Sequence, residues 1–268
     1  MNIIHLSALD LALAAILILA VAGLSVLLRL ELGKQFVIAA LRTTVQLLLI
    51  GLVLKVLFEN VHLGWITLLA TLMLLVAGRE VMARQHRRFS GWWGYGLGTM
   101  SMFISSFSVT VLALLVVIGN DPWYEPQYAI PMLGMMLGNT MTGVALGLDR
   151  LTQSAWQQRA VIESRLTLGE AWHEAVREIR QESMRVGMLP IINAMAAAGI
   201  ISLPGMMTGQ ILAGAPPMEA VKYQILIMFM IASGTGFATM AAVSIGARHL
   251  FDERERLRLD RLHGAAGG

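Results

Sequence analysis

The sequence predicts an all-α membrane protein that crosses the bilayer about seven times. Hydrophobic residues occupy 56% of the 268 positions, without counting 26 glycines, and charged residues occupy 14%. Soluble domains contain about 45–50% apolar residues with glycine included and about 25% charged residues. Several apolar stretches also approach the roughly 20 residues that a helix needs to cross a hydrocarbon layer of about 30 Å.

The seven expected membrane helices run approximately over residues 8–28, 36–57, 63–77, 96–118, 130–148, 188–212 and 223–246. The third is short, so we expect it to be shifted or tilted. The first has no positive charge ahead of it and exceeds the length of a signal-peptide core, so we expect it to be retained.

The basic residues predict the orientation of these helices. All but three of the 20 Lys and Arg residues follow the first, third, fifth or seventh helix, the exceptions being Arg42, Lys55 and Lys222. Because basic loops stay on the cytoplasmic side, the N-terminus is expected outside and the C-terminus in the cytoplasm. We expect residues 1–268 to form a single membrane domain. Within it, residues 149–187 would form a cytoplasmic segment and residues 248–268 would form a cytoplasmic tail. We assign no role to the final HGAAGG of this tail.

Several classes of function are excluded or disfavoured. Topology explains the net charge of +3, so no nucleic-acid partner is expected. The absence of cysteine excludes disulfides and thiolate-bound metals within the chain. No stretch fits the phosphate-binding pattern G-x-x-x-x-G-K-[ST]. We therefore expect neither a catalytic residue nor a cofactor in this chain.

The cytoplasmic segment is expected to contain a helix that begins near Thr167. Thr167 and Glu170 have the spacing of a capping box, in which both side chains bond backbone N–H groups at a helix start. Apolar residues then recur at helical spacing, at Trp172, Val176 and Ile179. Acid–base pairs occupy the other face, namely Glu174–Arg177 and Glu182–Arg185. Two interpretations stay open: a solvated surface helix, or a break at Leu168-Gly169 that docks on a cytoplasmic partner.

Six segments resemble one known family, the iron-export ABC transporter permeases of the Fet type (FetB-like), which includes plant aluminium-tolerance permeases. They are LRTTVQLLLIG (41–51), GMMLGNTMTG (134–143), Gly169-Glu170-Ala171, MLPIINAM (188–195), SLPGMMTGQILAG (202–214) and AVKYQI (220–225). The resemblance covers nearly the whole chain. The segment SLPGMMTGQILAG is its most specific part.

This resemblance implies a permease domain in the inner (cytoplasmic) membrane that exports iron. Its expected partners are membrane lipid, a second permease copy and a separate FetA-like ATPase that binds ATP and Mg. The ATPase-coupling residues would be Leu168, Gly169, Glu170, Ala171 and Trp172. Some plant relatives are associated with a nucleotide-sugar substrate, so a nucleotide sugar or copper remains an alternative cargo.

A secondary transporter driven by an ion gradient is the rival class. Such proteins commonly carry paired ionisable residues at the membrane midplane and repeat symmetry between halves. Neither feature is evident in this sequence, which favours the ATP-driven class.

Polar residues inside the expected helices are candidates for the transport path. Arg42 and Gln46 share one face of the second helix, and a charge at depth, costing roughly 2.5–3.5 kcal/mol if central, usually faces a cavity. Arg42 is also near enough to the cytoplasmic end to reach the headgroups. Asn139 of the fifth helix and Asn193 of the sixth either line the path or bond between helices.

Glycine pairs and a proline predict the packing and the break of the later helices. Gly134-x-x-x-Gly138 and Gly143-x-x-x-Gly147 allow close helix approach, within the subunit or at a dimer interface. Pro204 and Gly205 should break the sixth helix. Broken backbone at membrane depth must be buried in protein or line a cavity, which makes Thr208 and Gln210 candidates for path lining.

The metal ligands cannot be assigned from residue types. The 18 methionines carry soft sulfur, which prefers Cu(I), whereas iron prefers imidazole and oxygen ligands, so most are expected to fill the core. The middles of the helices contain no Asp, Glu or His. Three interpretations stay open: weak ligation by carbonyl and amide oxygens, a peripheral His or Glu, or a complexed or anionic cargo.

Overall fold

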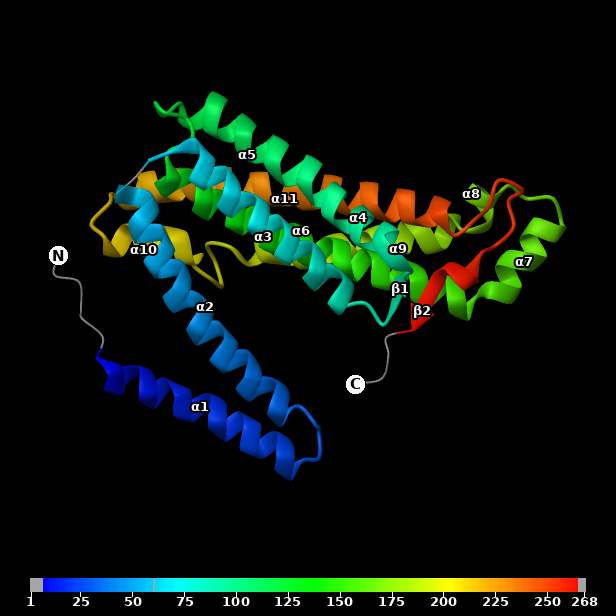
Figure 1. Cartoon of the computed structure of the whole chain (residues 1–268), viewed down its shortest axis with the longest axis horizontal. Coiled ribbons are helices and arrows are strands. Elements are labelled where there is room, and N and C mark those ends of the chain that lie inside the picture. Colours follow the sequence, from blue (N-terminus) through cyan, green and yellow to red (C-terminus); the bar gives the residue numbers. More distant parts are fainter. Residues whose placement is uncertain (1–6, 60, 265–268) are drawn as a thin grey trace. The chain divides into compact units, whose positions relative to one another are not determined.

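A computed structural model describes residues 7–59 and 61–264 and shows an all-α polytopic membrane protein (Figure 1). Six helical stretches of the described chain are long and apolar enough to cross a membrane. They are α1 (Ala8–Leu27), α2 (Gly33–Glu59), α3 (Leu63–Ala83), Gly91–Ile118, α6 (Pro126–Gln157) and α11 (Pro217–His249). The fourth stretch joins α4 (Gly91–Met102), η1 (Phe103–Phe107), α5 (Ser108–Leu112) and η2 (Ala113–Ile118), of which η1 and η2 are π-helical.

The predicted sixth membrane helix is not continuous, and six stretches of the described chain, where about seven were expected, are long and apolar enough to cross a membrane. Its residues lie in α9 (Arg177–Ala197) and α10 (Gly205–Leu212), with Ala198–Pro204 outside any helix. The helix stops at Ala198, whose backbone is extended, and Gly199 follows with φ of +82°. Such a φ is readily adopted by glycine only, which explains an end well before Pro204.

The chain divides into two compact units, the first built of α1, α2 and Leu212–Gly214. Within this unit α1 and α2 form a tight hairpin. A Cβ added at Gly33 would lie 2.9 Å from the carbonyl oxygen of Ala22, so the two helices approach closely there. The hydroxyl of Ser25 accepts a hydrogen bond of 3.1 Å from the Leu32 N–H and closes the turn.

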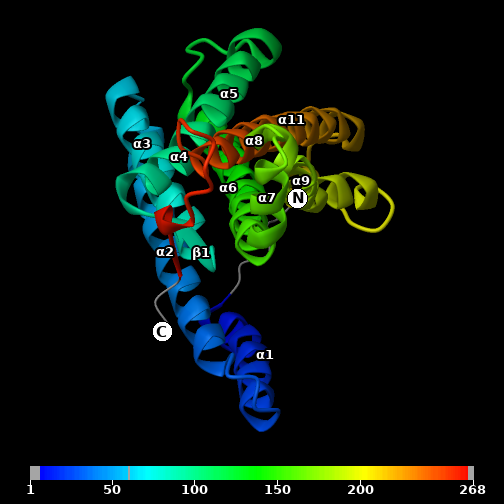
Figure 2. The ribbon, with the colours of Figure 1, turned by 90° about the vertical axis from the view of Figure 1, so that its right-hand side faces the viewer.

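The second unit, from Leu63 onward except Leu212–Gly214, is built around α6. Helices α3, α4, α9 and α11 pack against α6, and Figure 2 shows them grouped around it. The fully buried side chains of this core include Val144, Leu148, Leu151 and Val243. The core described by these residues therefore lies along the C-terminal half of α6 and its contact with α11.

A seam of small residues holds α6, α9 and α11 together. A Cβ at Gly143 would lie 2.6 Å from Thr235 Cγ2, and one at Gly187 would lie 2.6 Å from the Gly143 carbonyl oxygen. A Cβ at Gly147 would lie 3.4 Å from the Ser183 carbonyl oxygen, so Gly143 and Gly147 of α6 lie opposite Gly187 and Ser183 of α9, and the two helices run antiparallel. The second predicted glycine pair thus makes its close approach within this subunit, whereas a Cβ at Gly138 would meet nothing within 4 Å.

A short β-ribbon connects the end of the described chain to the loop after α3. Strands β1 (Arg87–Phe89) and β2 (Leu262–Gly264) are antiparallel, with Phe89 opposite Leu262. His263 and Gly264, to which the sequence assigned no role, belong to this ribbon; residues 265–268 lie outside the described part. Between α6 and α9 lie α7 (Arg159–Thr167) and α8 (Trp172–Ala175), and η3 (Leu259–Arg261) precedes β2.

Candidate functional site

The predicted coupling residues form a turn between α7 and α8. The N–H of Gly169 donates to the Leu166 carbonyl at 3.0 Å, and that of Glu170 donates to the Arg165 carbonyl at 3.1 Å. With φ of +91° at Gly169, this pattern is a Schellman motif that ends α7. The side chain of Leu168, at the tip of the turn, is 82% exposed.

The predicted helix start at Thr167 is therefore wrong. Thr167 is the last residue of α7, and its hydroxyl donates back to the Glu163 carbonyl at 2.8 Å. The expected apolar face is present, since Val176 and Ile179 are buried, but the helix is interrupted at Val176. Both predicted acid–base pairs form, Glu174–Arg177 at 3.4 Å and Glu182–Arg185 at 2.7 Å.

Behind the exposed turn, Trp172 anchors it to the chain that follows α11. The Trp172 N–H donates to Glu255 Oε2 at 3.1 Å, and its ring lies 5.8 Å from that of Phe251. The Arg248 guanidinium carbon lies 5.2 Å from the centre of the same ring, within reach of a cation–π contact. The turn thus presents an apolar tip on a base that is fixed by backbone, aromatic and charged contacts.

Carboxylates organise the C-terminal loop, Phe251–Arg261. Asp252 accepts from the N–H groups of Arg254 and Arg256 at 2.9 Å each, and the bond from the Arg256 N–H is the main cause of the lowered pKa of Asp252. Arg258 makes two side-chain hydrogen bonds of 2.8 Å to Asp260, which lower the pKa of Asp260 to about 2.

Acid is expected to loosen this loop. The folded pKa values of Asp252 and Asp260 lie below the ordinary value near 3.9, so their stabilising contacts are present above about pH 4 and are lost as pH falls toward about 2. Because the chain has no cysteine, a spin label on Glu253→Cys measures the mobility of the loop directly. We expect mobility to rise between about pH 4 and 2 there but not for a label on Val161→Cys of α7; equal behaviour at both sites would contradict this role of the carboxylates.

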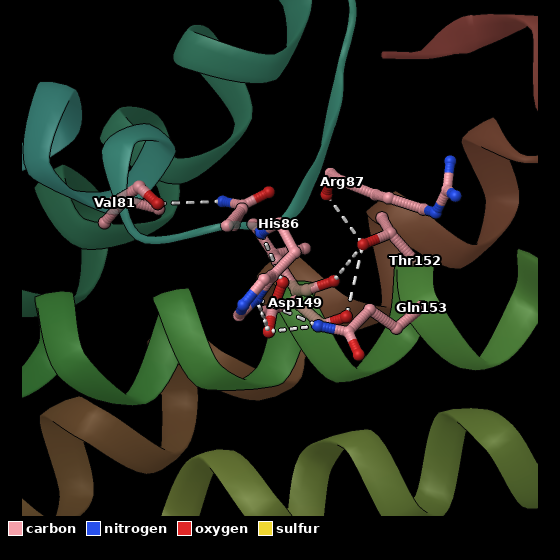
Figure 3. A network of polar contacts seen from close by, with 8 residues as sticks. Val81, His86, Arg87, Asp149, Thr152 and Gln153 are labelled. Carbon is pink, nitrogen blue, oxygen red and sulfur yellow. Dashed lines mark hydrogen bonds and ion pairs between the residues drawn. The ribbon is translucent and has the colours of Figure 1, made fainter. Parts of the chain in front are cut away.

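A second polar cluster joins the C-terminal part of α6 to the loop after α3 (Figure 3). Asp149 accepts from the His86 N–H at 2.7 Å and from Gln153 Nε2 at 2.8 Å, and its Oδ2 lies 3.2 Å from His86 Nδ1. Beside it, the Thr152 hydroxyl donates to the Arg87 carbonyl at 2.8 Å, and the Arg87 guanidinium lies 3.9 Å from the centre of the Trp156 ring. The cluster fixes the direction of the chain as it enters β1.

Removing the Asp149 carboxylate is expected to destabilise the protein. Asp149→Ala leaves the His86 N–H without its acceptor, and a hydrogen bond to a charged group contributes about 1.5–3 kcal/mol. Asp149→Asn keeps one acceptor oxygen and should lose less. Thermal unfolding in detergent measures both, with Arg150→Ala at the neighbouring exposed position as the control; an equal decrease in all three variants would contradict the assignment.

The candidate path residues of the second unit fall into two groups. Asn139 is exposed on α6 and Asn193 is exposed on α9. At 1.5 Å per residue, Asn139 lies about 6 Å along its helix from Gly143, and Asn193 lies about 9 Å along its helix from Gly187. Because the two helices are antiparallel, both residues lie on the same side of the Gly143–Gly187 contact. Thr208 and Gln210 are partly buried on α10, which begins directly after Pro204, at Gly205. The Thr208 hydroxyl donates to the Pro204 carbonyl at 3.2 Å.

Arg42 and Gln46 belong to the first unit. Both side chains are exposed on α2, one turn apart on the same face. This arrangement keeps both interpretations of Arg42 open, and their role in a path stays a prediction.

Residues 8–251 match the Uncharacterised protein family (UPF0014). The chain belongs to UPF0014. It is 30% identical to the "Probable iron export permease protein FetB" of Escherichia coli, with 94% of this chain and 95% of the relative covered. It is 31% identical to the "UPF0014 membrane protein YjkA" of Bacillus subtilis (93% and 98% covered) and to the "Protein ALUMINUM SENSITIVE 3" of Arabidopsis thaliana (87% and 82%). No solved structure was found to match the chain.

These relatives confirm the family resemblance of the sequence, and they make this UPF0014 chain a member of a membrane permease family. In the described residues of this UPF0014 chain, no three His, Asp or Glu side chains gather to hold a metal ion.

Several buried polar side chains are not among the residues predicted from the sequence. Ser105 donates to the Gly234 carbonyl at 2.6 Å, and Ser106 lies 3.0 Å from the Thr140 hydroxyl. Gln224 of α11 is buried as well. The polar residues in apolar runs were visible in the sequence, but their burial depends on how each helix is rotated.

Proposed function

We propose that this chain is the permease subunit of an ATP-driven exporter that moves iron out of the cytoplasm. A separate FetA-like subunit binds ATP and Mg and hydrolyses the nucleotide. The proposal is supported by the membership in UPF0014, by the printed name of the Escherichia coli relative and by the polytopic helical fold. The basic loops support an inner-membrane orientation with the C-terminus in the cytoplasm.

The exposed turn at Leu168 is the observation that carries this proposal. An element that transmits force between subunits needs an accessible contact surface and a rigid attachment. Leu168 supplies an exposed apolar contact, and the Schellman motif at Gly169 and the anchor at Trp172 supply the attachment. We assign Leu168, Gly169, Glu170, Ala171 and Trp172 as the contact that inserts into a groove of the ATPase.

The exposed amides support an assembly of two permease copies. Asn139 and Asn193 are exposed on apolar helices. The Asn139 amide nitrogen donates to the Met135 carbonyl at 2.8 Å, and an amide atom that stays unpaired in hydrocarbon costs several kcal/mol, roughly 2–7 depending on the reference. A water-filled path between two copies would solvate both side chains.

Reconstitution tests the whole proposal. The chain and the candidate ATPase are placed together in lipid vesicles, and Fe²⁺ movement and ATP turnover are measured at the same time. We expect movement of Fe²⁺ only when both subunits and ATP are present. Transport without the ATPase would overturn the ATP-driven mechanism, and ATP-dependent movement of a nucleotide sugar but not of Fe²⁺ would overturn the assignment of the cargo.

A further inference from the structure

A cavity of about 490 Å³ lies beside the break between α9 and α10. The break contributes Gly199 and Pro204 to its wall, and α11 contributes Gln224. Three methionines also line it, Met195 in the last turn of α9, Met207 in the first turn of α10 and Met228 on α11. The side chains that surround this space therefore come from three helices and from the non-helical segment between two of them.

The buried amide of Gln224 points to a ligand in this cavity. Its residue is only 8% exposed, and in the described part of the chain its Oε1 atom has no hydrogen-bond partner. A buried acceptor without a donor or a cation costs about 1–3 kcal/mol. Gln224 and Met228 are four residues apart on α11, so both face the cavity from the same side of that helix.

The chemistry of the wall selects one class of ligand. Its donors are three thioether sulfurs and an amide oxygen, and its described lining contains no Asp, Glu or His. Thioethers are soft ligands that favour Cu(I) over the harder divalent ions. An uncharged wall also disfavours divalent ions, because it supplies no negative charge to offset the desolvation of a cation.

Packing argues against these methionines serving only as filler. Methionine usually fills irregular gaps in a core. Here the three side chains border a partly open space of about 490 Å³ and leave it unfilled. We infer that the cavity binds a soft monovalent metal cation, Cu⁺ or its analogue Ag⁺, through Met195, Met207, Met228 and Gln224. This site goes beyond the proposed iron export and needs neither ATP nor the ATPase.

Competition for Cu⁺ tests the inference on the purified full chain in detergent without oxygen. Bicinchoninate, a chelator that forms a coloured Cu⁺ complex, reports the metal that the protein withdraws. We expect the unaltered chain to withdraw one Cu⁺ that Ag⁺ displaces and Zn²⁺ does not. The double variant Met207→Leu/Met228→Leu should bind Cu⁺ at least about tenfold more weakly, since even indirect ligand partners contribute that much.

Matched variants separate this site from other methionines and from misfolding. Met100→Leu/Met240→Leu replaces two exposed methionines outside the cavity and should leave Cu⁺ binding unchanged. Gln224→Met replaces the amide oxygen by a fourth thioether and should retain binding, whereas Gln224→Leu should weaken it. If the double variant does not fold, Met195→Leu at the end of α9 provides the test. An unaltered chain that binds no Cu⁺, or equal losses in the cavity and control variants, would overturn the inference.

Discussion

Leu168→Asp is expected to abolish ATP-driven export while the chain stays folded in the membrane. Leu168 is the exposed tip of the turn after α7, so the substitution costs little in the isolated chain. In the proposed contact with the ATPase, however, the carboxylate would be buried without a partner, which is strongly unfavourable. A loss of 2 kcal/mol or more, typical of a central interface residue, would weaken assembly more than about tenfold.

Three measurements distinguish this result from misfolding. Membrane insertion should be unchanged, whereas co-purification with the ATPase and Fe²⁺ export from vesicles should both fall. Val161→Asp, at an exposed apolar position of α7, the helix that ends just before Leu168, is the matched control and should leave export intact. Gly169→Pro should also uncouple the subunits, because proline holds φ near −65° and cannot adopt the +91° found there. Normal assembly and export in Leu168→Asp and Gly169→Pro would remove the coupling role from this turn.

Gly187→Ala is expected to destabilise the second unit by about 1–3 kcal/mol, the usual cost of overpacking. The added methyl group would lie 2.6 Å from the Gly143 carbonyl oxygen. Because that oxygen belongs to the backbone of α6, the steric clash can be removed only if α6 and α9 move apart. Thr239 Cγ2, also at 2.6 Å, restricts movement toward α11.

The matched control for this prediction is another glycine of the same bundle. Gly138→Ala adds the same methyl group where nothing lies within 4 Å, and alanine favours a helix over glycine by about 1 kcal/mol. Thermal unfolding in detergent should therefore show a lower midpoint for Gly187→Ala and an equal or higher midpoint for Gly138→Ala. A similar midpoint in both variants would show that the close approach does not limit stability.

The membrane helices were predictable because apolar length is a strong local signal, but their ends were not. The fifth predicted helix ended at Leu148, whereas α6 continues to Gln157. In this extension Leu151 and Ala155 are fully buried in the hydrophobic core, although polar residues flank them in the sequence, so the helix leaves the apolar run without leaving the core. Hydropathy finds the part of a helix that suits lipid and misses the part that protein covers.

The candidate turn shows how one local pattern supports two structures. Thr167 and Glu170 fit a capping box, yet Gly169 between them fits the end of a helix equally well. The contacts of Trp172 with Phe251 and Glu255 favour the second arrangement. Those partners lie far along the chain, as do Phe89 and Leu262 of the β-ribbon. No short-range pattern carries information about such pairs.

The length and continuity of helix α11 allow it to transmit motion between its two ends. At 1.5 Å per residue its 33 residues make a rod about 50 Å long. Its C-terminal end adjoins Arg248 and Phe251, which contact Trp172, and its N-terminal part carries Gln224. The fourth stretch is interrupted by the π segments η1 and η2, but α11 is a single uninterrupted α-helix. A displacement of the turn at Leu168 would thus tilt α11 as a rigid body and move its far end. The close contact of Gly143 with Thr235 is the point about which α11 would tilt.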